Sequence, residues 1–249
     1  MATQTNIQKQ LWDVFMQQYT QKLRNYFPMI YNTDYTAVIV ETRNDAHIET
    51  VAKNMMYFLN ESNSDIKWGL HIFYHDTNKE RVETFTKYWK NVKLTKLDNN
   101  ITNQNEYSTV LTSLNFWNLI NSNNILIFQK DSLLIRHGID DYLNYNYVGA
   151  PWIKPKEGKY IGNGGLSFRK KEKMIEIITN YSDELKDGMY NEDIFFSKYL
   201  NVEDVPSLEM CKKFSVEDVP HHSPMGLHQP KIYSQLMKNL LKSGVSNIV

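Results

Sequence analysis

The chain has 249 residues, and its 28 lysines and arginines balance 28 aspartates and glutamates, so the formal net charge is zero. This length suits one large α/β domain and is sufficient for a single hydrophobic core. A neutral chain lacks the basic excess of nucleic-acid-binding proteins, which argues against a nucleic-acid partner. The single cysteine, Cys211, excludes an internal disulfide framework and fits a reducing compartment.

The first ten residues are polar and lack the apolar core of a secretory signal. No stretch of the sequence is both long and apolar enough to predict a transmembrane segment. We therefore expect a cytoplasmic protein.

The first half of the chain shows a regular alternation of helical and strand patterns. Apolar residues recur at helical spacing over residues 7–23, which predicts an N-terminal helix that ends before Pro28. Strands and helices that alternate in this way indicate βαβ units and a mostly parallel sheet. We expect strands at residues 37–40, 68–74, 92–97 and 125–128, and helices at residues 48–59, 82–89 and 107–119.

The pattern changes after Asp131. Short apolar pieces separated by Gly and Pro predict mixed or antiparallel strands at residues 133–135, 147–150 and 165–168, with a last strand at 214–216. Helices are expected at residues 174–181, 194–200 and 232–241. Because no linker separates the halves, we predict an N-terminal helical segment (1–30) and one α/β domain (31–249), with a nucleotide-binding half (31–131) and a more irregular half (132–249).

The strand at residues 125–128 is apolar throughout and is followed by Gln129, Lys130 and Asp131. Buried parallel strands have such continuous apolar runs, and open α/β sheets bind ligands beyond the carboxyl ends of their strands. A carboxylate at this position can bind Mg²⁺ or Mn²⁺. The alternative is that Asp131 caps the following turn.

A glycine-rich turn, Gly162-Asn163-Gly164-Gly165, follows in the second half. Glycines allow positive φ angles and a close approach of the backbone to a ligand. The same residues are compatible with a tight hairpin between Tyr160 and Leu166. Basic residues flank the turn and either attract an anion or form a solvated face: Lys154, Lys156, Lys159, Arg169, Lys170, Lys171 and Lys173.

Glu192 and Asp193 open the helix predicted at residues 194–200. Carboxylates are favoured in the first turn by the helix dipole, so a capping role is one interpretation. The other is that one of them is a general base that accepts a proton from an attacking hydroxyl.

Two further side chains are candidates. His228, in a segment fixed by Pro224 and Gly226, is a possible metal ligand, whereas His221 and His222 fit an exposed loop. The ring of Trp152 either stacks on a sugar or packs in the core.

Seven short segments in a fixed order are more specific than any one of them. Together they resemble a family of uncharacterised GT-A-like glycosyltransferase domains found in giant viruses, bacteria and fungi, and the resemblance spans residues 36–230. The segments are residues 38–43, 127–132, 147–152, 162–169, 191–193, 214–217 and 224–228.

The resemblance implies a GT-A fold, in which a Rossmann-like, mixed but mainly parallel sheet flanked by helices joins an acceptor half in a single domain. It places Glu41, Thr42 and Arg43 beside the nucleobase and ribose of a nucleotide sugar. It also implies that Gly164 and Gly165 shape the sugar pocket.

The metal and catalytic roles follow from the same resemblance. Asp131 corresponds to the last Asp of the Asp-x-Asp metal motif, whereas Gln129 occupies its first acidic position and removes one negative charge. His228 is similar to the C-terminal histidine that completes the metal shell. Asp193 corresponds to the general base, and Glu192 to a residue that orients the acceptor.

Our hypothesis is a glycosyltransferase that moves a sugar from a nucleotide-sugar donor to a hydroxyl of a glycan, protein or small-molecule acceptor, with inversion and with Mn²⁺ or Mg²⁺. Two alternatives remain open. The first is a metal-dependent phosphoesterase or nuclease that uses the same carboxylates, although the neutral charge argues against a nuclease. The second is a non-catalytic nucleotide-sugar-binding module, a GT-A fold that kept its pocket but lost the metal. Gln129 is the residue that supports this second alternative.

Overall fold

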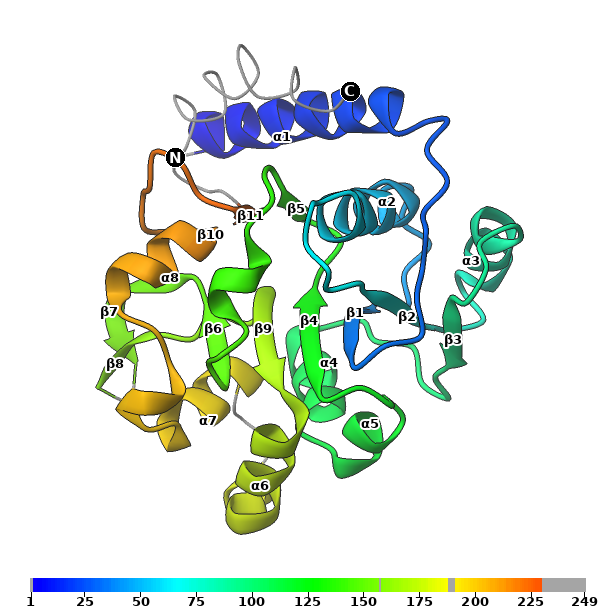
Figure 1. The fold of residues 1–249 in the computed structure, drawn as a ribbon. Coiled ribbons are helices and arrows are strands. Elements are labelled where there is room, and N and C mark those ends of the chain that lie inside the picture. Colours follow the sequence, from blue (N-terminus) through cyan, green and yellow to red (C-terminus); the bar gives the residue numbers. More distant parts are fainter. Residues whose placement is uncertain (1, 157, 188–190, 230–249) are drawn as a thin grey trace.

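The structure is a computed structural model that describes residues 2–156, 158–187 and 191–229. The helix predicted at residues 232–241 lies outside the described residues. The centre of the fold is a six-stranded sheet with strand order β3-β2-β1-β4-β9-β6 (Figure 1). These strands are β1 (Tyr35–Val40), β2 (Gly69–Tyr74), β3 (Lys93–Lys96), β4 (Asn124–Phe128), β6 (Tyr147–Gly149) and β9 (Leu166–Lys170).

The sheet is mixed but mainly parallel. Strands β3, β2, β1 and β4 run in the same direction, and β9 is antiparallel to both of its neighbours, β4 and β6. The predicted α/β fold with a mostly parallel sheet is therefore confirmed, and so is the prediction that the strands become mixed after Asp131.

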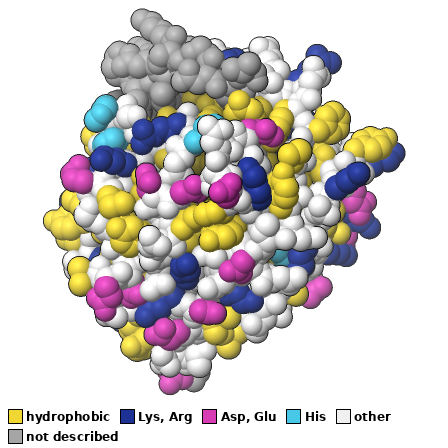
Figure 2. Space-filling model, in the orientation of Figure 1, with side chains coloured by type: hydrophobic (Ala, Val, Ile, Leu, Met, Phe, Trp, Pro, Cys, Tyr) yellow, Lys and Arg dark blue, Asp and Glu magenta, His cyan; other side chains and the backbone are white. Residues whose placement is uncertain are grey.

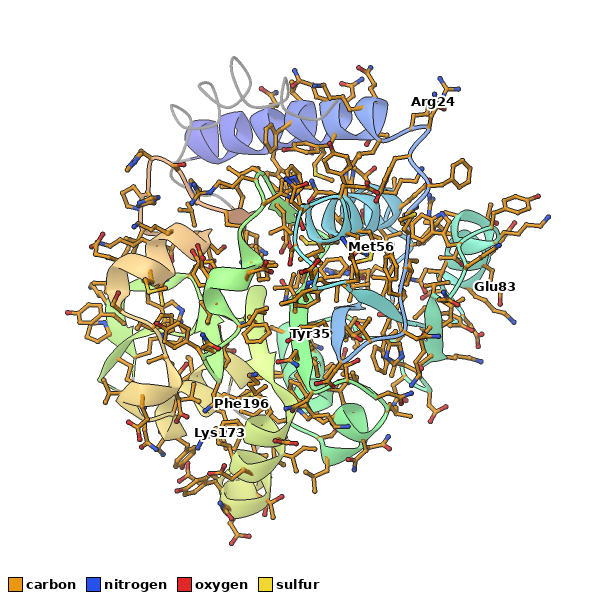
Figure 3. The ribbon with its side chains drawn as sticks, viewed as in Figure 1. Arg24, Tyr35, Met56, Glu83, Lys173 and Phe196 are labelled. Carbon is orange, nitrogen blue, oxygen red and sulfur yellow. The ribbon has the colours of Figure 1, made fainter. Side chains whose placement is uncertain are left out.

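Alternate side chains of the central strands enter two separate cores, because successive residues of a strand point to opposite faces. In β1, Ala37 and Ile39 join the core beneath α1 (Ala2–Lys22) and α2 (Ile48–Asn60), while Val38 enters the core on the opposite face. Figure 3 shows Met56 on α2 and Phe196 on α7 (Glu192–Tyr199), which belong to these two cores.

Helices cover both faces of the sheet. Helices α1 and α2 lie together on one face, and α3 (Lys79–Thr86) lies beside the edge strand β3 (Figure 1). The opposite face is covered by α4 (Gln104–Leu111), α5 (Leu114–Asn118), α6 (Lys171–Tyr181) and α7 (Glu192–Tyr199).

Smaller elements complete the second half. A three-stranded sheet has the order β10-β11-β5, and β7 pairs with β8 as an antiparallel hairpin. These strands are β5 (Ser132–Leu134), β7 (Pro151–Lys156), β8 (Lys159–Ile161), β10 (Ser215–Val216) and β11 (Gly226–His228). The remaining helical segments are α8 (Leu208–Phe214) and three 3₁₀ helices at Ile139–Tyr142, Ser182–Asp187 and Val202–Asp204.

Two local predictions were wrong. The helix predicted at residues 107–119 is two helices, because the Ser113 hydroxyl accepts a hydrogen bond from the Phe116 N–H at 3.2 Å and starts α5 anew. The hairpin considered for residues 160–166 lies earlier, between β7 and β8, and residues 162–165 instead connect β8 to β9. Neither the β7–β8 hairpin nor α8 was predicted.

The surface agrees with the neutral composition. On the face shown in Figure 2, basic and acidic side chains are interspersed, and neither forms a large patch of its own. Within the described ranges, no helix combines the length and the hydrophobicity needed to cross a bilayer.

Candidate active site

A cleft of about 310 Å³ opens where β1 and β4 end. The carboxyl ends of parallel strands meet at one edge of a sheet, so the segments that follow β1 and β4 are brought together there. All but one of the residues that the family resemblance or the sequence assigned to the site line this cleft: Glu41, Thr42, Arg43, Gln129, Asp131, Gly164, Gly165, Glu192, Asp193 and His228.

Trp152 is the exception, and its predicted contact with the sugar is not supported by its position. The indole is only 4% exposed and does not line the cleft. The Lys156 ammonium lies 4.7 Å from the ring centroid. The position of Trp152 agrees with the alternative interpretation, in which the ring packs in the interior.

The segment after β1 is held in place by its own side chains. The buried carboxylate of Glu41 accepts hydrogen bonds from Nε and Nη2 of Arg43 at 2.8 and 2.7 Å. The Thr42 hydroxyl donates to the Ile101 carbonyl at 3.0 Å and accepts from the Ile101 N–H at 2.9 Å. These bonds fix the loop after β1 against the segment that leads into α4.

That segment adds cleft residues that the sequence analysis missed. Asn103, Gln104 and Tyr107 line the cleft from the first turn of α4. The sequence pattern assigned Tyr107 only a helical position, because an aromatic residue at helical spacing gives no sign of which face meets a ligand.

His228 lies at the centre of the second group of cleft residues. Its Nε2 is 3.1 Å from Oε1 of Gln129 and 3.6 Å from Oδ1 of Asp131. Its Nδ1 is 3.4 Å from Oε2 of Glu217. A Cβ at residue 165 would come within 2.0 Å of the imidazole, so the ring occupies space that only a glycine leaves open.

The residues around His228 fit a divalent cation. Oδ1 of Asp131 is a buried carboxylate oxygen with no hydrogen-bond partner among the described residues. Donors that share one ion at about 2.1 Å from each lie about 3 to 4 Å apart. The separations of His228 Nε2 from the oxygens of Gln129 and Asp131 satisfy this condition. Over the part of the chain that the structure describes, no group of three or more His, Cys, Asp or Glu side chains forms a metal site. The protein donors would therefore be few, as is common for Mg²⁺ sites completed by substrate phosphates.

A buried ion pair supports Glu192. Arg169 has no exposed surface, and its Nη2 is 3.1 Å from Oε1 of Glu192. The guanidinium lies 4.9 Å from the Tyr147 ring and 5.5 Å from the Phe196 ring. Arg169 is thus not part of a solvated basic face, contrary to one of the two interpretations of the basic residues around the glycine turn.

Asp193 lies beside the glycine turn at the start of α7. Its Oδ2 accepts a hydrogen bond from the Gly164 N–H at 3.2 Å, and its Oδ1 accepts one from the Ile194 N–H at 2.8 Å. Burial and, next in size, the negative charge of Glu192 raise the pKa of Asp193 to about 7. A carboxylate with this pKa can exchange a proton near neutral pH.

Three residues that support the site were given no role in it from the sequence. Asn163 and Glu217 lie inside segments that carry the family resemblance, but nothing in the sequence brought them together. Arg169 offered a signal, since it is a charged residue inside an otherwise buried strand.

Comparison with solved structures identifies the fold. The glycosyltransferase GlyE of Streptococcus pneumoniae TIGR4, in its apo form, is similar with a TM-score of 0.54 and 14% identity over 87% of this chain. The galactosyltransferase LgtC, in complex with donor and acceptor sugar analogues, is similar with a TM-score of 0.53 and 12% identity over 78% of this chain and 86% of LgtC. The molecule therefore has the GT-A fold.

The particular family follows from the sequence. Residues 91–228, more than half of the chain, match the family described as "Protein of unknown function (DUF5672)", and the chain belongs to that family. No curated protein matches the sequence. The match covers only 62% of GlyE, so this chain spans less than two thirds of that protein's length.

Proposed function

We propose that this protein is a glycosyltransferase that transfers a sugar from a nucleotide-sugar donor to an acceptor hydroxyl. The observation that carries the proposal is the convergence, on one cleft of a GT-A fold, of the five separate segments whose residues were predicted from the sequence. Two of them follow β1 and β4, one connects β8 to β9, one begins α7 and one forms β11. The similarity to GlyE and LgtC supports the same activity.

In the proposed reaction, the acceptor oxygen attacks the anomeric carbon and the bond from that carbon to the diphosphate oxygen breaks. The nucleoside diphosphate leaves with the bonding electrons, and the proton of the acceptor hydroxyl passes to Asp193. Such an attack from the face opposite the leaving group inverts the anomeric configuration. A base with a pKa of about 7 is well matched to this step at neutral pH.

The other cleft residues have positioning roles in the proposal. Glu41, Thr42 and Arg43 contact the nucleoside, and Gly164 and Gly165 allow the sugar to approach the backbone closely. Glu192, held by Arg169, orients the acceptor.

Asp131 and His228, with Gln129 beside them, would hold Mn²⁺ or Mg²⁺. A divalent cation at this position supplies positive charge that stabilises the leaving diphosphate.

The proposal is tested by incubating the protein with a panel of nucleotide sugars, with and without Mn²⁺, and following hydrolysis and transfer by mass spectrometry. Release of a nucleoside diphosphate from one donor supports it. Cleavage of simple phosphoesters without any use of nucleotide sugars would replace it with the phosphoesterase alternative. Calorimetric binding of a nucleotide that is independent of Mn²⁺, without turnover, would favour a binding module.

The substitution Asp193→Asn tests the base directly. We expect transfer to fall by about 10²- to 10⁴-fold, the usual contribution of a general base, while donor binding stays within a few-fold. The circular dichroism spectrum and the calorimetric affinity for the donor serve as controls. A variant that folds and transfers sugar at the wild-type rate would show that Asp193 is not the base.

A further inference from the structure

The two nitrogens of His228 face different groups. Nε2 points to Gln129 and Asp131, at 3.1 and 3.6 Å, on the side where the proposed cation binds. Nδ1 is 3.4 Å from the Glu217 carboxylate on the other side of the ring. A neutral imidazole carries one proton. Nε2 can donate it to Oε1 of Gln129 when no cation is bound, but a cation on that side needs the Nε2 lone pair, and the proton must then be on Nδ1, facing Glu217.

The position of Glu217 follows from strand register. Strands β10 and β11 are parallel, and Ser215 pairs with Gly226 while Val216 pairs with Leu227. The next step of the same register brings Glu217 opposite His228. Both side chains are buried, at 6% and 5% exposure, so the carboxylate faces the imidazole away from bulk water.

A second residue holds Glu217 in place. The Asn163 amide nitrogen donates a hydrogen bond to Oε2 of Glu217. Asn163 is fixed in turn, because its Oδ1 accepts from the Gly165 N–H at 3.1 Å and its own N–H donates to the Ala150 carbonyl at 3.1 Å. The glycine turn, the carboxylate and the histidine therefore form one connected arrangement.

We propose that Glu217 is a positioning residue that accepts the Nδ1 proton of His228 and so directs the Nε2 lone pair toward the cation held with Asp131. Metal-binding histidines usually donate their second N–H to such a partner, which fixes the tautomer and raises the basicity of the ligating nitrogen. The proposal rests on the proposed function for the presence of the cation, and it is testable without any sugar transfer.

The first experiment compares the tautomer of His228 in the unmodified protein without metal and with saturating Mg²⁺. Nitrogen-15 NMR of the histidine side chains, with the His228 signals assigned from their loss in His228→Gln, distinguishes a protonated from an unprotonated ring nitrogen. With Mg²⁺ bound, we expect the proton on Nδ1. A proton on Nε2 in the Mg²⁺-bound wild-type protein overturns the proposal, and this result does not depend on any Glu217 variant folding.

The second experiment measures the affinity for Mn²⁺ alone by electron paramagnetic resonance. Removing the acceptor in Glu217→Leu should weaken binding by about 10- to 100-fold, the usual effect of losing such a partner. Glu217→Gln keeps one acceptor oxygen and should retain more affinity than the Leu variant. Asp218→Asn changes the neighbouring carboxylate, which does not line the cleft, and should bind Mn²⁺ within about twofold of the wild type.

The outcomes separate this proposal from the proposed function. Unchanged Mn²⁺ affinity in folded Glu217→Leu, or a wild-type protein that binds no Mn²⁺, overturns the role of Glu217 even if the protein transfers sugar. The expected tautomer with the expected loss of affinity supports that role even if no sugar donor is turned over. A merely structural role for Glu217 would lower the unfolding midpoint and leave the Mn²⁺ affinity of the folded variant unchanged.

Discussion

Asp193 combines burial with a neighbouring negative charge, and both favour its neutral form. Its pKa of about 7 lies above the ordinary 3.8, so the carboxyl is protonated at mildly acidic pH and ionised at mildly basic pH. A general base acts only when it is ionised. We therefore expect kcat/KM for transfer to rise about tenfold per pH unit below 7 and to level off above it.

The control is the residual activity of Asp193→Asn, which should lack this inflection. The measurement is initial rate against pH at fixed Mn²⁺, with donor concentrations well below KM. A wild-type profile that is flat from about pH 5 to 8 would contradict the assignment of Asp193 as the base.

Gly165 illustrates how a residue without a side chain shapes the site. The space that a Cβ would need at this position is taken by His228, whose ring would lie 2.0 Å from it. In Gly165→Ala the ring must move, and we expect a loss of about 1 to 3 kcal/mol of stability from overpacking. Because the ring then leaves Asp131, Mn²⁺ affinity measured by calorimetry should fall by about tenfold or more.

Gly158→Ala is a suitable control for Gly165→Ala. Residue 158 has a positive φ, +76°, but a Cβ there meets nothing within 4 Å. The control should lose some stability through backbone strain and bind Mn²⁺ normally. Equal loss of Mn²⁺ affinity in both variants would show that the effect of Gly165→Ala is not local to His228.

At the scale of elements, the ion pair of Arg169 and Glu192 links β9 to α7 inside the protein. Removing one partner leaves an uncompensated buried charge. We expect Arg169→Met to lower the free energy of unfolding by about 3 to 5 kcal/mol. The double variant Arg169→Met/Glu192→Gln should be less destabilised than the sum of the single changes, by about 1 to 3 kcal/mol.

Urea denaturation of the wild type, Arg169→Met, Glu192→Gln and the double variant measures the interaction energy between Arg169 and Glu192. Simple additivity of the two changes would mean that the pair contributes no interaction energy. Sequence periodicity alone gave no sign of this pair, because its two members are separated by 23 positions and lie on different elements.

Most individual elements were predictable because they depend on local patterns. The continuous apolar run of β4 and the helical spacing of α2 each appear as expected. The break between α4 and α5 was missed, because a serine at position 113 is also compatible with a helix interior. Only the structure shows that its hydroxyl accepts a hydrogen bond from the Phe116 N–H and caps a new helix. The β7–β8 hairpin was missed because β7 contains two prolines and both strands carry lysines, so neither shows the usual apolar run.

At the scale of the whole molecule, α1 and the residue that follows it belong to the main core. Their buried side chains, Phe15, Met16, Tyr19 and Leu23, are each at most 1% exposed. Burial of four such side chains contributes about 6 to 12 kcal/mol, comparable with the entire stability of a typical domain. Deletion of residues 1–24 should therefore abolish cooperative unfolding, measured by circular dichroism during heating.

The matched control changes only the exposed face of α1. In Asp13→Ala/Gln17→Ala both altered side chains are exposed, so the melting temperature should stay close to that of the wild type. A truncated protein that melts cooperatively near the wild-type temperature would show that α1 is dispensable for the fold.

The sequence by itself determined the fold class, the order of most strands and helices, and the residue types at the candidate site. These features follow from hydrophobic periodicity and from polar residues at strand ends, which are local properties of the chain. Only the tertiary structure decided which residues meet. It placed Glu217 against His228 through the pairing of β10 with β11, buried Arg169 beside Glu192, and kept Trp152 out of the cleft. Such contacts depend on strand register and packing between distant segments, and no local pattern specifies them.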